Sequence, residues 1–356
     1  MSGKRTAGII GAAIGGVAAL TAVGVAVEKY AIGRIHTGED RFAGEPFGEL
    51  PVDRTCTVVA MDGVPLHVAE IGPRNAPLTV VLVHGFALSL ESWHFQILAL
   101  AEVPGVRLVL YDQRGHGRSG RGPAAHATIT QLGADLGMVI DTVAGTGRLV
   151  LIGHSMGGMA ILGLAQQRPD FFASRVGGLG LVATSAGRLA TGLLGAAVAR
   201  SVRQMHYVAG AGLRRTPAAL VERTRKAGAD IAWMLTRRYG FGSTDASPSL
   251  VGFADRMIGA TPVDVIGELL PEFGDRDQHG ALPALDAVPT RIVVGERDLL
   301  TPPSHSQDIA DSLPDAKLTV VKGAGHLVML EQPDRVTGAL RDLVTAAVRR
   351  PRERRR

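Results

Sequence analysis

Cysteine is nearly absent from this sequence, since Cys56 is the only one among 356 residues. A single thiol cannot close an internal disulfide or form a CxxC metal site, so a disulfide-stapled domain and a cysteine-based zinc module are both excluded. Charged residues are also few, at 20%, against 46% hydrophobic residues. This balance excludes the composition of a disordered chain. We therefore expect a folded protein with a large core.

Net charge is absent from most of the chain. The excess of 38 Lys and Arg over 33 Asp and Glu equals the charge of residues 349–356, which hold six arginines and one glutamate. This basic tail lacks aromatic residues and any recognised nucleic-acid module, so we expect no nucleic-acid partner. We interpret it as a solvated terminus, with contact to anionic lipid headgroups as the alternative.

A long apolar run stands near the N-terminus, at residues 7–27, and only Thr21 interrupts it. As a helix rising about 1.5 Å per residue, it would match the thickness of a bilayer core. We predict a single-pass membrane anchor followed by a tether over residues 1–50. The alternatives are a cleaved signal of a secreted protein and a buried or interfacial helix. Basic residues flank the run on both sides, so the orientation stays open.

Short apolar runs rich in Val, Leu and Ile recur through the middle of the chain, and helical patterns separate most of them. This alternation predicts an α/β fold with a mostly parallel sheet flanked by helices. A hairpin turning at Asp62-Gly63 is expected to precede it. The expected strands are 79–83, 106–111, 148–152, 176–182, 291–294 and 318–321. The expected helices are 91–102, 129–143, 156–167, 304–312 and 334–348.

The alternation is interrupted once, for about a hundred residues of helical character. We predict that residues 186–285 form a helical cap, inserted between a first core part at 51–185 and a second at 286–348, with the tail 349–356 at the end. Four large side chains of the cap are candidates to line a pocket, although packing is the commoner role of such residues. They are Trp233, Tyr239, Phe253 and Met257.

Gly153-His154-Ser155-Met156-Gly157-Gly158 follows an expected strand and precedes an expected helix. A serine on such a sharp strand-to-helix turn has strained backbone angles, and the flanking glycines leave room for the turn. The turn points Ser155 out of the sheet as a candidate nucleophile. A phosphate-binding loop is the alternative reading, but no G-K-[ST] follows.

A serine nucleophile needs a base, and the base needs a carboxylate, in the chain order Ser, acid, His. Asp298 and His326 each follow an expected strand, so both fall at the edge of the sheet where ligands bind. His326 is predicted to take the Ser155 proton, and Asp298 to hold its tautomer. Rival candidates remain for both roles. They are Glu296 and Asp286 for the acid, and His279 and His305 for the base.

Two backbone amides are candidates for an oxyanion hole. Met156 begins the helix after the serine, and Phe86 lies in the turn His84-Gly85-Phe86 at the end of a strand. An ordinary turn with a packed aromatic ring is the plainer interpretation of the second. His154 is expected to orient or pack and not to act as the base, because neighbouring residues on a tight turn point apart.

At these residues the chain resembles the α/β-hydrolase superfamily. The resemblance covers roughly residues 55–348 outside the cap, in the motifs HGF at 84–86, DQRGHGRS at 112–119, GHSMGG at 153–158, GERDLLTP at 295–302 and GAGH at 323–326. It implies an α/β-hydrolase sheet, a triad of Ser155, Asp298 and His326, and an oxyanion hole of Phe86 and Met156. It also implies that the 112–119 loop, with Arg114, braces the site. Neither a cofactor nor a metal is expected.

The serine narrows the chemistry that the resemblance implies. Haloalkane dehalogenases and epoxide hydrolases of this superfamily use an aspartate at that position. The first hypothesis is therefore a membrane-tethered serine hydrolase of a lipid or other apolar acyl ester. Alternatives on the same fold are a cofactor-free haloperoxidase or perhydrolase and a C–C bond hydrolase. A non-catalytic ligand-binding module is the alternative of another class.

Overall fold

The computed structural model describes residues 40–187, 189, 235–243 and 245–349. The apolar run at 7–27, most of the predicted cap with Trp233, and the tail from residue 350 onward lie outside these residues. Within the described ranges, no helix combines the length and apolar character needed to cross a membrane. The predicted domain boundaries and the predicted anchor stay predictions.

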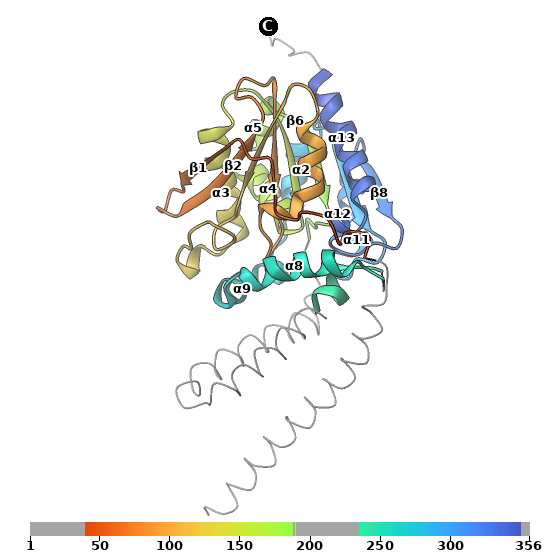
Figure 1. Ribbon diagram of the computed structural model, residues 1–356. Coiled ribbons are helices and arrows are strands. Elements are labelled where there is room, and N and C mark those ends of the chain that lie inside the picture. The colour runs from red at the N-terminus through yellow and green to blue at the C-terminus, as the bar shows by residue number, and fades with distance from the viewer. Residues whose placement is uncertain (1–39, 188, 190–234, 244, 350–356) are drawn as a thin grey trace, which may run out of the picture.

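The described residues form an eight-stranded sheet in the order β1-β2-β4-β3-β5-β6-β7-β8 (Figure 1). β1 and β2 form the expected hairpin, β2 is also antiparallel to β4, and every other neighbouring pair is parallel. The predicted α/β fold with a mostly parallel sheet is therefore confirmed. The strands are β1 Arg54–Val59, β2 Pro65–Ile71, β3 Leu78–Val83, β4 Val106–Tyr111, β5 Arg148–His154, β6 Val176–Val182, β7 Thr290–Gly295 and β8 Lys317–Val321.

Helices cover both faces of the sheet, which explains why every residue of β3, β4 and β6 is buried. One core lies under α3, α4, α5 and α11, and the other under α2, α12 and α13. Their bounds are α2 His94–Ala101, α3 Ile129–Val143, α4 Met156–Gln167, α5 Pro169–Arg175, α11 Pro303–Ser312, α12 Val328–Glu331 and α13 Pro333–Arg349, with 3₁₀ turns η1 Leu90–Trp93 and η2 Ala124–His126.

The sequence patterns locate the long helices closely and miss the short ones. The ranges of α3 and α4 coincide with the expected ones. The helix expected at 91–102 begins instead as the 3₁₀ turn η1, where the Ser89 hydroxyl accepts the Glu91 N–H. α5 and α12 were not expected, because seven and four residues are too few to show a helical period.

The described part of the segment between β6 and β7 is helical. It contains α8 Pro248–Ala260, α9 Val263–Leu269, α10 Glu272–Asp275 and the 3₁₀ turn η4 His279–Leu285. α8 and α9 lie at the end of the sheet where α12 follows β8 (Figure 1). Phe253 and Met257 are buried in the core beside α2, so packing is their role, as in the plainer interpretation.

Residues 40–50 belong to the predicted tether, yet they pack against the body of the protein. The Phe47 ring stacks on Phe253 of α8 at 4.6 Å between centroids and meets Phe95 of α2 edge-on. The Asp40 carboxylate accepts the Ser249 N–H at 3.1 Å, in the first turn of α8. This stretch thus joins α8 to α2.

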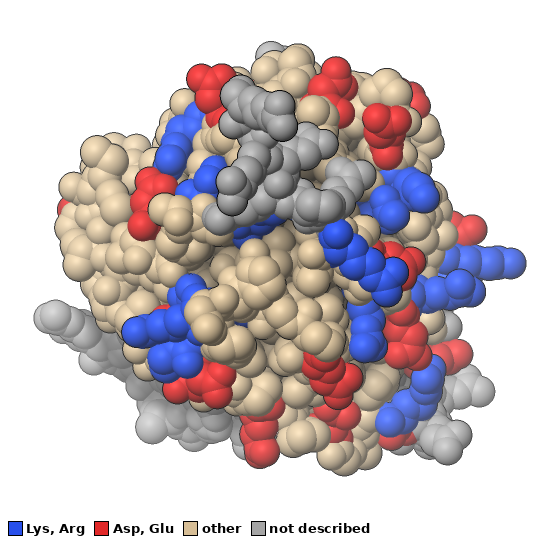
Figure 2. Space-filling model, turned by 90° about the horizontal axis from the view of Figure 1, so that it is seen from above, with Lys and Arg blue, Asp and Glu red and all other residues tan. Residues whose placement is uncertain are grey.

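The opposite end of the molecule presents charges of both signs. Figure 2 looks onto the face that is uppermost in Figure 1, remote from α8 and α9, and shows acidic and basic side chains interspersed over it. This distribution agrees with the charge balance of the chain without its tail.

Candidate active site

Ser155 lies at the turn between β5 and α4, with φ 49° and ψ −118°. A positive φ is uncommon for a residue with a side chain and marks local strain. Neighbouring segments hold the turn in this conformation. The Ser155 N–H donates to the Val182 carbonyl at 2.9 Å, and the Thr184 hydroxyl donates to the Ser155 carbonyl at 2.7 Å.

The glycines of the turn are needed because backbone approaches backbone there. A Cβ on Gly153 would meet the amide of Gly158, and a Cβ on Gly157 would overlap the carbonyl oxygens of Val83 and His84 at the end of β3. The strand-to-helix turn therefore depends on hydrogen-only side chains at both positions.

Gly157→Ala is expected to lower the free energy of unfolding by about 3 kcal/mol, because the added methyl group meets rigid backbone. Gly338→Ala is the matched control, since Gly338 also lies within a helix but has no neighbour within 4 Å of an added Cβ. That control is expected to raise the free energy of unfolding by about 0.5–1 kcal/mol. Urea unfolding measures both. Equal effects of the two substitutions would contradict this account of the turn.

The fold brings Ser155, His326 and Asp298 together from three separate strand ends. The Ser155 Oγ lies 2.9 Å from His326 Nε2, and His326 Nδ1 lies 2.9 Å from Asp298 Oδ2. The three residues are 8%, 6% and 3% exposed. This arrangement can remove a proton from the serine hydroxyl and pass it to a leaving group, with the carboxylate stabilising the imidazolium.

Asp298 is held as a carboxylate. Its Oδ1 accepts the backbone N–H groups of Leu300 and Thr301, and its Oδ2 accepts the Thr301 hydroxyl at 2.8 Å. Burial raises the pKa of Asp298, but His326 and these hydrogen bonds outweigh burial and hold the pKa below its ordinary value. Asp298 therefore stays charged where His326 needs it.

Thr301 is a site residue that the sequence reasoning missed. Besides facing Asp298, its hydroxyl lies 2.9 Å from the Ala183 carbonyl and 3.2 Å from His326 Nδ1. Its position three residues after Asp298, in the motif GERDLLTP, is the signal that points to it. Thr301 links the loop after β7 to the end of β6.

The rival candidates contact other groups. Glu296 is exposed and accepts the Gly323 N–H at 2.9 Å, and Asp286 is exposed after η4. His279 pairs with Asp277 on the surface, and His305 Nδ1 lies 2.7 Å from the Ser185 hydroxyl. Their hydrogen bonds go to these partners, while Ser155 bonds His326.

The two proposed oxyanion donors lie near the serine. Met156 is the first residue of α4, where the helix itself offers its N–H no acceptor. Phe86 follows Gly85, and a Cβ built on Gly85 would lie 3.3 Å from the Ser155 Cβ. The loop of Phe86 therefore runs beside the serine, as an oxyanion hole requires.

Buried histidines brace the turn that carries Phe86. His84 Nε2 accepts the Gln113 N–H at 2.9 Å, and His116 Nε2 accepts the Ala87 N–H at 3.1 Å. An imidazole that accepts a hydrogen bond is neutral. Burial lowers the pKa of His84 to about 4 and that of His116 to about 3.

His154 also packs and orients, as expected from its place beside the serine. Its Nε2 lies 3.0 Å from the His326 carbonyl, so the Nε2–H donates there. Burial, with His326 close by, lowers the pKa of His154 to about 3.

Acid is expected to destabilise the protein through these three histidines. Each has a native pKa of about 3–4, against 6.5 in a model chain, so the unfolded state binds up to three more protons below pH 6.5. Stability is complete above pH 6.5 and falls as the pH drops toward 4, by up to about 4 kcal/mol per unit. Urea midpoints measured between pH 7.5 and 4.5 check this slope. A flat profile would contradict it.

The 112–119 loop braces the site through buried contacts. Asp112 accepts the Leu90 and Arg118 N–H groups, and Arg114 pairs with Asp135 and Asp62. The Arg114 pairs are buried or nearly so, which ties the loop to α3 and to the β1–β2 turn.

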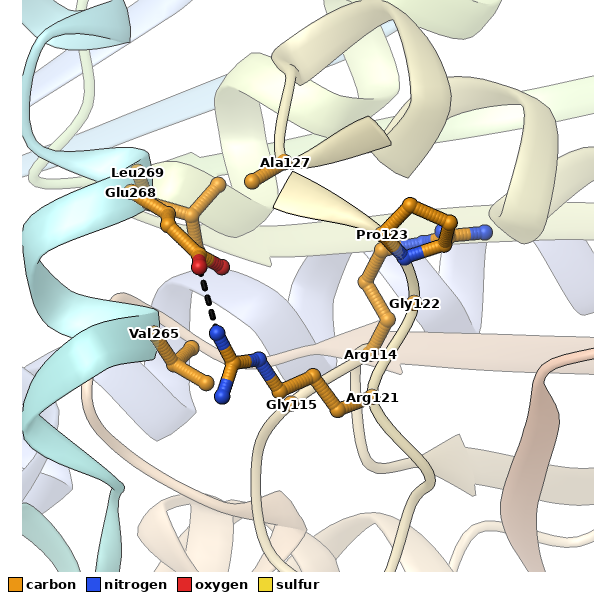
Figure 3. A pocket seen from close by; sticks show the side chains of 9 residues that line it. All are labelled: Arg114, Gly115, Arg121, Gly122, Pro123, Ala127, Val265, Glu268 and Leu269. Atoms are coloured by element: carbon orange, nitrogen blue, oxygen red, sulfur yellow. Dashed lines mark hydrogen bonds and ion pairs between the residues drawn. The ribbon is translucent and has the colours of Figure 1, made fainter. Parts of the chain in front are cut away.

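A shallow recess lies beside this loop and apart from the triad. Figure 3 shows Arg121 reaching across it to pair with Glu268 of α9, while Val265, Leu269 and Ala127 supply apolar walls. Among the described residues, no group of three or more His, Cys, Asp or Glu side chains is placed to hold a metal ion.

Comparison with known proteins agrees with this architecture. Epoxide hydrolase A of Mycobacterium tuberculosis is 42% identical over 105 residues, which are 29% of this chain and 32% of the relative, so the match spans about a third of that enzyme. A thermophilic esterase from Thermogutta terrifontis aligns over 83% of this chain and 99% of its own, with 27% identity and a TM-score of 0.65. The enol-lactonase of Burkholderia xenovorans aligns over 82% and 100%, with 25% identity and a TM-score of 0.61.

A model of the Alpha/beta hydrolase family matches residues 80–339, more than two thirds of the sequence. The matched range includes β3 to β8 and all three residues of the Ser155–His326–Asp298 arrangement. The chain belongs to the alpha/beta hydrolase family.

Proposed function

We propose that this protein is a serine hydrolase that cleaves a carboxylic ester. The observation that carries the proposal is the continuous hydrogen-bonded chain from Ser155 through His326 to Asp298, at 2.9 Å for each step. The strained turn under Ser155 and the two amides beside it supply the remaining parts that acyl transfer needs.

In the proposed reaction, Ser155 Oγ attacks the ester carbonyl carbon while His326 Nε2 takes the hydroxyl proton. The N–H groups of Met156 and Phe86 stabilise the negative oxygen of the tetrahedral intermediate. The intermediate collapses to an acyl-enzyme as His326 returns the proton to the leaving alcohol. A water molecule, deprotonated by His326, then releases the carboxylic acid and restores the serine.

The likeness to an esterase and an enol-lactonase supports an ester substrate, since a lactone is a cyclic ester. The partial likeness to an epoxide hydrolase carries less weight, because the epoxide hydrolases that this chain resembles use an aspartate where Ser155 stands. Preference for an apolar acyl group and attachment to a membrane are further parts of the proposal, and both rest on the sequence of residues 7–27 and 186–285.

The test is a chain-length series of p-nitrophenyl esters, combined with labelling by a fluorophosphonate, on the full-length protein. We expect turnover, covalent labelling, and a rate maximum at an acyl length that measures the pocket. Parallel assays with peroxide and acetate distinguish a perhydrolase. A protein that binds an acyl ligand but shows neither turnover nor an acyl-enzyme burst would be a binding module, and this outcome would refute the proposal.

A further inference from the structure

The loop that carries His326 is joined to residues 240–243, which belong to the segment between β6 and β7. The Leu327 N–H donates to the Gly240 carbonyl at 2.7 Å. The backbones of Gly242 and Gly325 are so close that a Cβ on either one would overlap the other segment. Both sides of His326 therefore rest on a part of the chain that lies more than eighty residues away in the sequence.

Glu331, at the end of α12, is the side chain that closes this joint. Its Oε2 accepts the N–H of Gly325, next to His326, at 2.7 Å and the N–H of Gly242 at 3.0 Å. Its Oε1 accepts the Ser243 N–H at 2.7 Å. The residue is 9% exposed, so its carboxylate is largely removed from water.

Three backbone donors around one buried carboxylate form a strong and directional contact. A glutamine in the same place offers one oxygen and one NH₂ group, so at least one of the three amides would face another donor. An unpaired buried donor is costly, and the two segments would move apart to hydrate it.

We infer that Glu331 is a positioning residue, which holds His326 in register with Ser155 by fastening its loop to residues 240–243. The inference rests on the proposed function, since it assigns Glu331 a role in proton transfer by His326. It also makes the segment between β6 and β7 part of the support of the base. A shift of that segment changes the distance over which the proton moves.

The experiment compares Glu331→Gln with Glu296→Gln in the full-length protein. Glu296 is the matched control, because its carboxylate accepts an N–H of the same loop, that of Gly323, but from the exposed side. We expect Glu331→Gln to lower kcat by about 10- to 100-fold with KM within about threefold, because a small misplacement of a catalytic group has effects of this size. Glu296→Gln is expected to keep kcat within about twofold.

Both variants are assayed below their unfolding midpoints, and kcat is expressed per fluorophosphonate-titrated site, so that loss of folded protein does not count. Hydrogen exchange supplies a readout that needs no turnover. In Glu331→Gln, the amides of 242–243 and of Gly325 are expected to exchange faster together, while those of α3 keep their wild-type rates.

The inference is overturned if Glu331→Gln keeps kcat per site within twofold of wild type, or if the two segments keep their wild-type exchange. It is also overturned if Glu296→Gln lowers kcat as much as Glu331→Gln does. Failure of the proposed function has a different signature, since the wild-type protein itself would then show neither turnover nor labelling.

Discussion

Ser155→Ala is expected to lower kcat for ester hydrolysis by about 10⁴- to 10⁶-fold and to abolish fluorophosphonate labelling. Without the Oγ no acyl-enzyme forms, and the remaining rate comes from water acting beside the oxyanion donors. The fold should tolerate the change, because the smaller side chain adds no clash at a turn held by Val182 and Thr184. Steady-state kinetics and intact-mass spectrometry measure the two effects.

Ser185→Ala is the matched control for this prediction. Ser185 is likewise hydrogen-bonded to a histidine, at 2.7 Å from His305 Nδ1, but it is not on a strand-to-helix turn. Its substitution should leave labelling intact. If labelling survived in Ser155→Ala and vanished in Ser185→Ala, the nucleophile would be assigned to the wrong Ser–His pair.

Asp298→Asn is expected to lower kcat by about 10³- to 10⁴-fold while preserving the shape of the site. The asparagine cannot stabilise an imidazolium, and its NH₂ group can leave His326 with the proton on Nε2, facing Ser155. Fluorophosphonate labelling should slow in proportion, because it uses the same base. Rate constants for labelling and for p-nitrophenyl ester hydrolysis check the prediction.

Glu296→Gln is the control here too, since Glu296 is the rival acid two residues earlier in the sequence. It accepts a surface amide and should keep its activity. A large loss in Glu296→Gln beside a small loss in Asp298→Asn would reverse the assignment of the acid.

Local patterns in the sequence carry most of the fold. α3 and α4 coincide with their expected ranges because apolar residues recur at helical spacing between clear turn signals. The strands are found because burial on both faces leaves uninterrupted Val, Leu and Ile. The contact of Ser155, His326 and Asp298 follows from strand order, since parallel strands end at one edge.

Contacts between distant segments were not predicted. No local pattern at residues 40–50 shows that Phe47 stacks on Phe253, because that contact exists only after α8 is placed. Glu331 reads as an ordinary residue before a helix, although its carboxylate reaches amides 88 and 89 positions away. Tertiary packing decides such pairs, and a single sequence holds no periodic signal for them.

The Thr301 hydroxyl owns one hydrogen and has two oxygen acceptors, Asp298 Oδ2 at 2.8 Å and the Ala183 carbonyl at 2.9 Å. It can serve only one of them at a time. When it points to Asp298, it shares the carboxylate with His326, and when it points to Ala183, the whole charge of that oxygen is left to the imidazolium. Rotation about one side-chain bond thus works as a trimmer on the basicity of the carboxylate, and it does so without displacing a single heavy atom of the site.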